Sequence, residues 1–171
     1  MKTTEVVALG YRYPTPSAAG ELAAAIAGEH NHEVKRHMQH FLDGVTALLF
    51  SEWEELHTAT LDLSAPFVPY VGHVIWGDAY KRGEFMSELV PAMAEAGVDL
   101  HGELPDHIEP VLRYLAATDE PLPSLLEVLP GAVATMNQKL KRAAPGNPYC
   151  ELLAATLACA ANRPVTIGGR R

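Results

Sequence analysis

The spacing of apolar side chains restricts the fold of this chain more than any other feature of its sequence. Val34, Met38 and Phe41 are one example, because they recur three or four positions apart, as residues on one face of an α-helix do. The same spacing is found along most of the 171 residues. Strict alternation of apolar and polar residues, which is typical of half-buried strands, is almost absent. We therefore predict an all-α fold, a single-domain bundle of helices.

Capping and stop signals divide this pattern into individual helices. Ser17 is a suitable N-cap for a helix that we expect to stop at Gly28. Asp78 can cap another helix, Pro105 suits a first helical position, and Ser124 opens a capping box. The expected helices are residues 18–27, 32–50, 52–61 and 69–76, one from Asp78 to Gly97 that Pro91 kinks, one from Pro105, one from Ser124 that Pro130-Gly131 breaks or bends, and one from Asn147-Pro148 to Asn162-Arg163-Pro164.

The helices are expected to form one domain over residues 1–163. This domain has possible N- and C-terminal lobes joined by a hinge connector at residues 99–104, and residues 164–171 are expected to be a flexible tail. Cys150 and Cys159 are nine positions apart. On one helix this separation places them on opposite faces, too far apart for a disulfide.

Acidic residues outnumber basic ones. The chain carries 13 Lys and Arg against 21 Asp and Glu, a formal net charge of −8. Nucleic acids and anionic membranes favour a basic surface, so we expect neither as the main partner; the charge suits a cationic ligand or, more simply, solubility. The first residues lack the apolar run of a secretory signal, and no run approaches the roughly 20 apolar residues that span a bilayer. We therefore expect a cytoplasmic protein with no direct membrane insertion.

Histidines and carboxylates provide the main alternative to a binding protein. Glu29 and His32, and again Glu54 and His57, have the Glu-x-x-His spacing that di-iron helical bundles use. These pairs leave open a small helical metal-dependent oxidoreductase of the di-iron type. Other histidines in residues 30–40 are more simply explained as the solvated side of an amphipathic helix. The sequence has no glycine-framed nucleophile and no phosphate-binding loop, so we expect no catalytic residues.

Residues 66–83 are the most unusual stretch of the chain. They contain four aromatic residues, two prolines and three glycines. Aromatic side chains combine a large apolar area with polar tips, and glycines allow helices to approach closely. We interpret this stretch as part of a groove that receives an apolar or amphipathic peptide helix, lined by Tyr70, Trp76 and Tyr80.

Two motifs in the second half of the chain carry a resemblance to a known family. They are Asp78-x-x-Lys81-Arg82-Gly83 and Glu103-Leu104-Pro105-Asp106-His107. Over roughly residues 53–157 the chain resembles the NarJ/TorD/DmsD family of molybdoenzyme assembly chaperones, also called redox enzyme maturation proteins. It looks most like the nitrate reductase delta-subunit (NarJ-like) branch, while Pro69-Tyr70 resembles the Pro-Tyr element of the TorD side.

The resemblance implies an all-helical, cytoplasmic protein that is not an enzyme, and no cofactor is assigned to it. Its implied partner is the apo catalytic subunit of a molybdenum oxidoreductase, bound through an N-terminal twin-arginine leader or leader-like peptide. Binding would assist insertion of the molybdopterin cofactor and hold back export until maturation is complete. A monomer or a domain-swapped dimer is expected.

The resemblance and the aromatic stretch together indicate a peptide-binding site. Residues 103–107 correspond to the family's hinge motif, whose Asp-His pair has been associated with peptide binding. We expect Asp62, Glu103 and Asp106 to face the arginines of the peptide. Replacing Glu103 and Asp106 by their amides should then weaken binding and leave the fold intact. The expected peptide-binding residues are Asp62, Pro69, Tyr70, Trp76, Tyr80, Glu103, Asp106 and His107.

Overall fold

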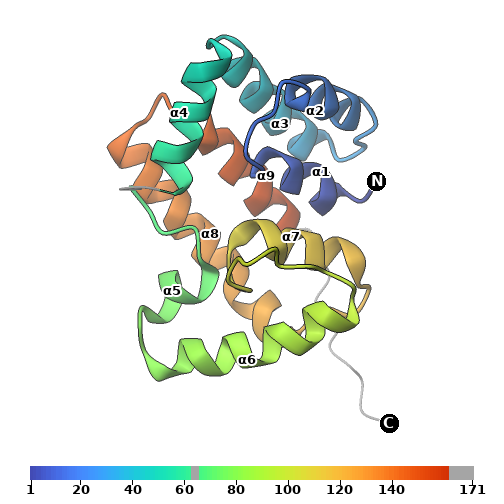
Figure 1. Ribbon diagram of the computed structural model, residues 1–171, viewed down its shortest axis with the longest axis vertical. Helices are drawn as coiled ribbons and strands as arrows, with labels where there is room; N and C mark the ends of the chain where they lie inside the picture. Colours follow the sequence, from blue (N-terminus) through green and yellow to red (C-terminus); the bar gives the residue numbers. More distant parts are fainter. Residues whose placement is uncertain (63–65, 162–171) are drawn as a thin grey trace.

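The computed structural model describes residues 1–62 and 66–161, and within these ranges it consists of helices with no strand (Figure 1). The prediction of an all-α single-domain fold is confirmed. The helices are α1 (Thr3–Gly10), α2 (Ala18–Ala27), α3 (His32–Thr46), α4 (Phe50–Leu61), α5 (Val71–Trp76), α6 (Tyr80–Glu95), α7 (Ile108–Ala117), α8 (Pro123–Ala143) and α9 (Tyr149–Ala161).

Local capping explains where several helices begin and end. The side chain of Asn31 accepts hydrogen bonds from the first backbone N–H groups of α3. α3 stops at Thr46 rather than at Phe50, because the Glu52 carboxylate accepts from the Leu49 N–H and starts α4 there. At the end of α6, Gly97 adopts a φ of 72° and the Val98 N–H bonds to an earlier carbonyl, as the glycine stop signal predicted.

α1 is a helix that the sequence analysis did not predict. It spans only eight residues, too few to show a clear helical period, and Glu5 caps its start by accepting from the Lys2 N–H. Val6 and Val7 are buried, and the helix packs against α7 and α9. α1 therefore packs the N-terminal segment against α7 and α9.

α7 begins later than predicted. Pro105 was expected to be its first residue, but α7 starts at Ile108 with His107 as N-cap. The backbone before it pairs instead with the segment that leads into α5. The Val71 N–H donates to the Asp106 carbonyl at 2.8 Å, and the Ile108 N–H donates to the Pro69 carbonyl at 3.0 Å. Pro105 and Asp106 form a turn, and this short antiparallel bridge holds His107 extended just before α7.

The prolines inside the long helices do not end them. α8 runs unbroken through Pro130 to Ala143, and α6 runs through Pro91. A break at Pro130-Gly131 was therefore a wrong expectation. Ser124 was also wrongly assigned as a cap, because α8 starts one residue earlier and the Ser124 hydroxyl donates to Glu88 on α6.

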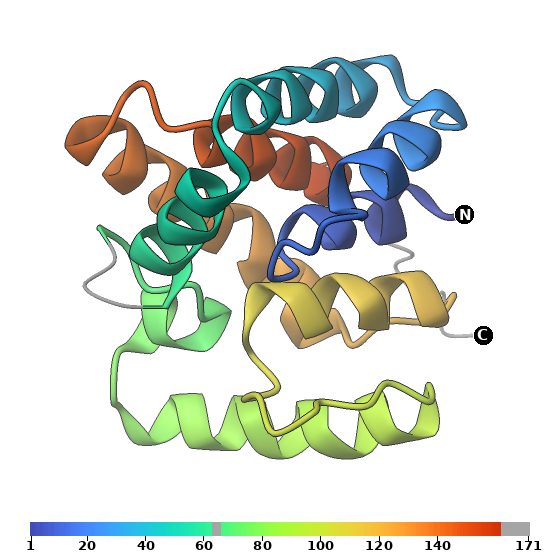
Figure 2. The same cartoon turned by 45° about the horizontal axis from the view of Figure 1, so that its top comes forward.

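The helices form one connected body. α9 lies in the core against α1, α3 and α8, and α8 extends from the part of the molecule that holds α5 to the part that holds α9. Figure 2 shows the connector after α6 doubling back toward the start of α7. α8 and the α1–α7 contact thus connect the parts of the fold that precede and follow residues 99–104. The predicted tail at 164–171 and the stop signal at 162–164 lie outside the described residues.

Two further expectations concern α9 and the membrane. Cys150 and Cys159 both lie on α9, both are buried and no disulfide joins them, as the helical spacing predicted. Within residues 1–62 and 66–161, every helix is too short or too polar to cross a bilayer.

Candidate functional site

Asp106 is the most constrained residue of the predicted site. Its side chain is 0% exposed. Its Oδ2 accepts hydrogen bonds from Arg82 Nε at 2.9 Å and from the Gly72 N–H at 3.1 Å, and its Oδ1 accepts from Arg82 Nη2 at 3.2 Å. The hydrogen bond to Asp106 raises the pKa of Arg82. Asp106 was expected to face a peptide arginine, but it is saturated by the protein's own arginine and joins the connector to α5 and α6.

Gly72 makes this arrangement possible. A Cβ added at this position would lie 2.8 Å from Asp106 Oδ2 and 3.1 Å from Arg82 Cγ. The first distance is shorter than real side chains allow, and both neighbours are held by their mutual ion pair. The requirement at position 72 is therefore one of space rather than of backbone conformation.

Tyr70 positions Glu103. Its hydroxyl donates to Glu103 Oε1 at 2.9 Å, and its ring packs edge-on against the His107 ring with centroids 5.1 Å apart. The Arg82 guanidinium lies over the Tyr70 ring, 5.6 Å from its centre. Burial and the hydrogen bond to Glu103 raise the pKa of Tyr70 to about 12, so it remains a donor at neutral pH.

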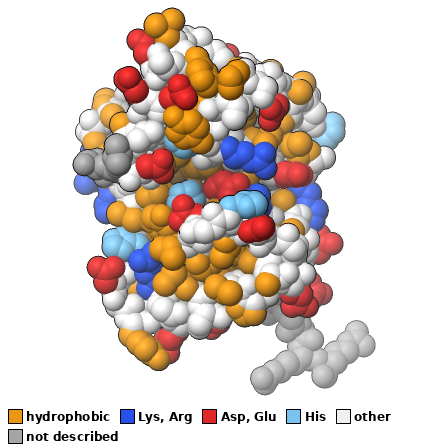
Figure 3. Space-filling model, viewed as in Figure 1, with side chains coloured by type: hydrophobic (Ala, Val, Ile, Leu, Met, Phe, Trp, Pro, Cys, Tyr) orange, Lys and Arg blue, Asp and Glu red, His pale blue; other side chains and the backbone are white. Residues whose placement is uncertain are grey.

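A cleft of about 630 Å³ opens beside the corner formed by Asp106 and His107 with Tyr70 and Arg82, and we call it the central cleft. In the space-filling view a hollow crosses the middle of the molecule, bordered by acidic, basic and histidine side chains (Figure 3). Its walls come from the segment after α1, the end of α4, the connector and the start of α7. The lining residues are Tyr11, Arg12, Tyr13, His57, Leu61, Asp62, Leu100, His101, Glu103, His107, Glu109 and Arg113.

Two buried histidines form part of the cleft wall. His57 Nδ1 lies 2.9 Å from the Tyr149 hydroxyl, and the Tyr13 ring packs edge-on against it. His107 Nδ1 accepts from the Glu109 N–H at 3.2 Å. Burial lowers the pKa of both histidines below the usual value of about 6.5. Both are therefore neutral at pH 7 and place no positive charge beside Asp62 and Glu103.

The structure brings together three of the predicted binding residues and separates others. Asp62, Glu103 and His107 line the central cleft, and the carboxylates of Asp62 and Glu103 are exposed. Tyr70 lies directly behind Glu103. Pro69 is buried and contributes its carbonyl to the backbone bridge.

Trp76 and Tyr80 are not part of the cleft. Trp76 packs on Phe85 with ring centroids 5.2 Å apart, below the nearby Lys81 ammonium. Tyr80 begins α6 and is 84% exposed. The prediction that these two side chains line the groove was therefore wrong, because Trp76 at the end of α5 and Tyr80 at the start of α6 lie outside the residues that line the cleft.

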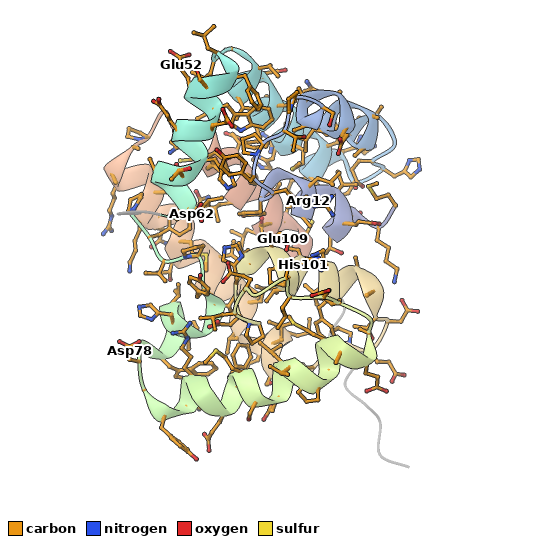
Figure 4. All side chains as sticks on the ribbon, in the orientation of Figure 1. Arg12, Glu52, Asp62, Asp78, His101 and Glu109 are labelled. Atoms are coloured by element: carbon orange, nitrogen blue, oxygen red, sulfur yellow. The ribbon has the colours of Figure 1, made fainter. Side chains whose placement is uncertain are left out.

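Arg12, Tyr13, Glu109 and Arg113 are cleft residues that the sequence analysis missed. Figure 4 shows Arg12 and Glu109 close together at one side of the cleft and Asp62 at the other, on the end of α4. Glu109 and Arg113 have the i, i+4 spacing of a helical ion pair, which was a usable signal. Arg12 and Tyr13 follow the unpredicted helix α1, so no local pattern placed them here.

The Glu-x-x-His pairs do not converge on a metal site. In the described parts of the chain, no three His, Cys, Asp or Glu side chains lie close enough together to hold a metal ion. Glu54 accepts a hydrogen bond from the Tyr13 hydroxyl, and Glu29 accepts from Thr3 and from the Asn31 N–H. These carboxylates thus have structural partners, and the di-iron alternative gains no support from the geometry.

The histidines of α3 have a structural contact too. His37 Nδ1 lies 2.6 Å from Glu151 Oε2 and His40 Nδ1 lies 3.6 Å from it, which links α3 to α9.

No family model matches the chain, and no curated protein sequence is significantly similar to it.

Proposed function

We propose that this protein is a system-specific cytoplasmic chaperone for a molybdenum oxidoreductase. In this proposal it binds the N-terminal twin-arginine leader or leader-like peptide of the apo catalytic subunit, assists insertion of the molybdopterin cofactor and holds back export until maturation. The observation that carries the proposal is the central cleft, which opens beside the Asp106–His107 corner and presents the exposed carboxylates of Asp62 and Glu103.

The lining of the cleft suits the chemistry of such a peptide. A leader combines arginines with an apolar segment. Asp62 and Glu103 offer carboxylates to the guanidinium groups, and Tyr70 holds Glu103 in place. Leu61, Leu100 and the Tyr13 ring supply apolar surface in the same cleft. Because His57 and His107 are neutral, they add no positive charge that would weaken the attraction of the two carboxylates for a cationic peptide.

The carboxylate pair has a further property that a binding site needs. Neither Asp62 nor Glu103 forms an ion pair with a lysine or arginine among the described residues. Both therefore remain available to a cationic ligand, whereas Asp106 does not. This difference favours a peptide contact with Asp62 and Glu103 rather than with the buried carboxylate of Asp106.

Calorimetry with synthetic peptides tests the proposal. The probes are the N-terminal segments of molybdenum oxidoreductase catalytic subunits encoded in the same genome, each paired with a copy in which the arginines are replaced by glutamine. We expect one probe to bind the full-length protein saturably, its glutamine copy to bind much more weakly, and added salt to weaken the complex, because exposed ion pairs are screened.

A matched set of variants then locates the contact. The double variant Asp62→Asn, Glu103→Gln should lower the affinity at least about tenfold. Glu127→Gln removes a carboxylate from an exposed position on α8 away from the cleft and should leave it unchanged. The proposal is wrong if no probe binds, or if the double variant binds as tightly as the wild type.

A further inference from the structure

The side of the central cleft opposite Asp62 has the reverse charge. Arg113 Nε lies 2.8 Å from Glu109 Oε1, and Arg12 Nε lies 3.9 Å from the same oxygen. Two guanidinium groups thus share a single carboxylate, which leaves one positive charge in excess. This local excess is notable in a chain whose net charge is −8. The cleft is therefore bipolar, with Asp62 on one side and this cationic group on the other (Figure 4), and the Glu103 carboxylate also lines it.

Arg12 is the member of the group that remains available. Its side chain is 52% exposed, whereas those of Arg113 and Glu109 are 20% and 16% exposed. The 3.9 Å approach to Glu109 is longer than a hydrogen bond. Among the described residues, no side-chain hydrogen bond from the Arg12 guanidinium satisfies its donors. Arg113 already satisfies Glu109, so Arg12 is not needed to neutralise that carboxylate.

We propose that Arg12 binds an aspartate or glutamate side chain of the same peptide whose arginines bind Asp62 and Glu103. This inference rests on the proposed function and adds a rule of recognition to it: the preferred segment is itself bipolar. A guanidinium can bind a carboxylate through two parallel hydrogen bonds, which fixes direction as well as adding affinity. Opposite charges at the two sides of the cleft also fix which way the peptide lies, since the reversed orientation brings like charges together.

Paired peptides and a matched pair of variants test this inference. The probes are synthetic arginine-pair peptides with an apolar helical segment, carrying glutamate or glutamine one or two helical turns from the arginines. We expect the better glutamate peptide to bind the wild type about tenfold more tightly than its glutamine copy. Arg12→Gln should remove this preference. Lys139→Gln, which removes the same charge from an exposed position on α8, should keep it.

The possible outcomes separate this inference from the proposed function. A glutamate preference that Arg12→Gln abolishes and Lys139→Gln retains supports it. Equal affinity of the glutamate and glutamine peptides at both spacings overturns it and leaves the proposed function standing. A preference that survives in Arg12→Gln also overturns it, because another group then reads the carboxylate. If no arginine-pair peptide binds, the inference and the proposed function are both wrong.

Discussion

Glu103 and Asp106 are three residues apart in one motif, yet the fold gives them opposite environments. Asp106 is fully buried and accepts three hydrogen bonds, two of them from Arg82. Glu103 is exposed at the rim of the central cleft, where Tyr70 donates to it. One carboxylate holds the corner together, and the other is presented to a ligand.

The difference shows how a short motif can combine two physical roles. A buried carboxylate that is fully paired contributes to the specificity of the local structure, and removing its partner leaves a charge without compensation. An exposed carboxylate contributes little to stability but keeps its capacity to bind a cation. Substitutions at Asp106 should therefore act on stability, and substitutions at Glu103 should act on affinity.

The largest effect is expected for Asp106→Asn. This change removes the carboxylate that the Arg82 guanidinium, whose side chain is only 14% exposed, contacts at hydrogen-bond distance, and leaves only the more distant Asp78, 3.9 Å away. We expect the free energy of unfolding to fall by about 3 kcal/mol. Urea denaturation measures it, and Glu103→Gln is the control, which should stay within about 0.5 kcal/mol of the wild type. The sequence analysis expected the double replacement of Glu103 and Asp106 to leave the fold intact, whereas the burial of Asp106 leads us to expect a loss of stability. Equal stability of the two variants would contradict the comparison.

Alanine substitutions at Gly72 and Gly83 test how tightly the residues around Asp106 are packed. Gly72→Ala places a methyl group 2.8 Å from Asp106 Oδ2 and should destabilise the protein by about 2 kcal/mol. Gly83, inside α6, has no atom within 4 Å of an added Cβ, so Gly83→Ala should stabilise by up to about 1 kcal/mol. Thermal unfolding of both variants measures the effects. Similar shifts of the same sign would show that the Asp106 corner has more room than the structure gives it.

The next effect is on the affinity for the peptide and concerns Tyr70, which donates to the exposed Glu103. Tyr70→Phe removes the hydroxyl that donates to Glu103 and leaves the ring in place. We expect the affinity for the leader peptide to fall about threefold, because Glu103 loses its fixed orientation but keeps its charge. Calorimetry of the variant measures this effect beside Glu103→Gln, which should lose more. If Tyr70→Phe weakens binding more than Glu103→Gln does, Tyr70 contacts the peptide directly.

The smallest effect is the pH dependence of His107. Burial lowers its pKa in the folded protein, although the nearby Glu103 and Glu109 oppose the shift. The stability that follows is complete above the unfolded pKa of about 6.5 and is lost as the pH falls through the lower folded pKa, at a cost below about 1 kcal/mol at pH 6. His107→Asn keeps an N-cap acceptor and removes the titration. Denaturation at pH 6 and pH 8 should show a smaller difference for the variant, and an unchanged difference would contradict the assignment.

The fold class could be predicted from the sequence because it depends on local periodicity. α2 and the end of α6 follow their stop signals closely. The start of α7 could not be predicted, since Pro105 suits a helix but lies in a turn, and a long-range bridge to Pro69 and Val71 holds His107 extended. α1 escaped notice because its eight residues are stabilised by contacts with α7 and α9 rather than by a pattern of their own.

The site was predictable only in part for a related reason. A sequence motif indicated Glu103 and His107, and Asp62 was expected as an acidic partner of peptide arginines; the fold brings all three to one cleft. Nothing local indicated that Arg82, from the other motif, would pair with Asp106 across 24 positions. Arg12 reaches the cleft only because α1 packs on α7. Pairings that depend on tertiary packing were therefore the ones that the sequence could not reveal.

Chemical-shift mapping by NMR on the isotope-labelled 18.5 kDa protein is the most direct test of peptide binding in the central cleft. The probe is the leader peptide that binds most tightly in calorimetry. Its addition should shift the backbone amides of Asp62, Glu103 and His107 and those of Arg12 and Tyr13, while the amides of the exposed end of α8 stay unchanged. Shifts confined to surfaces outside the cleft, such as the turn that carries Trp76 and Tyr80, would contradict the account.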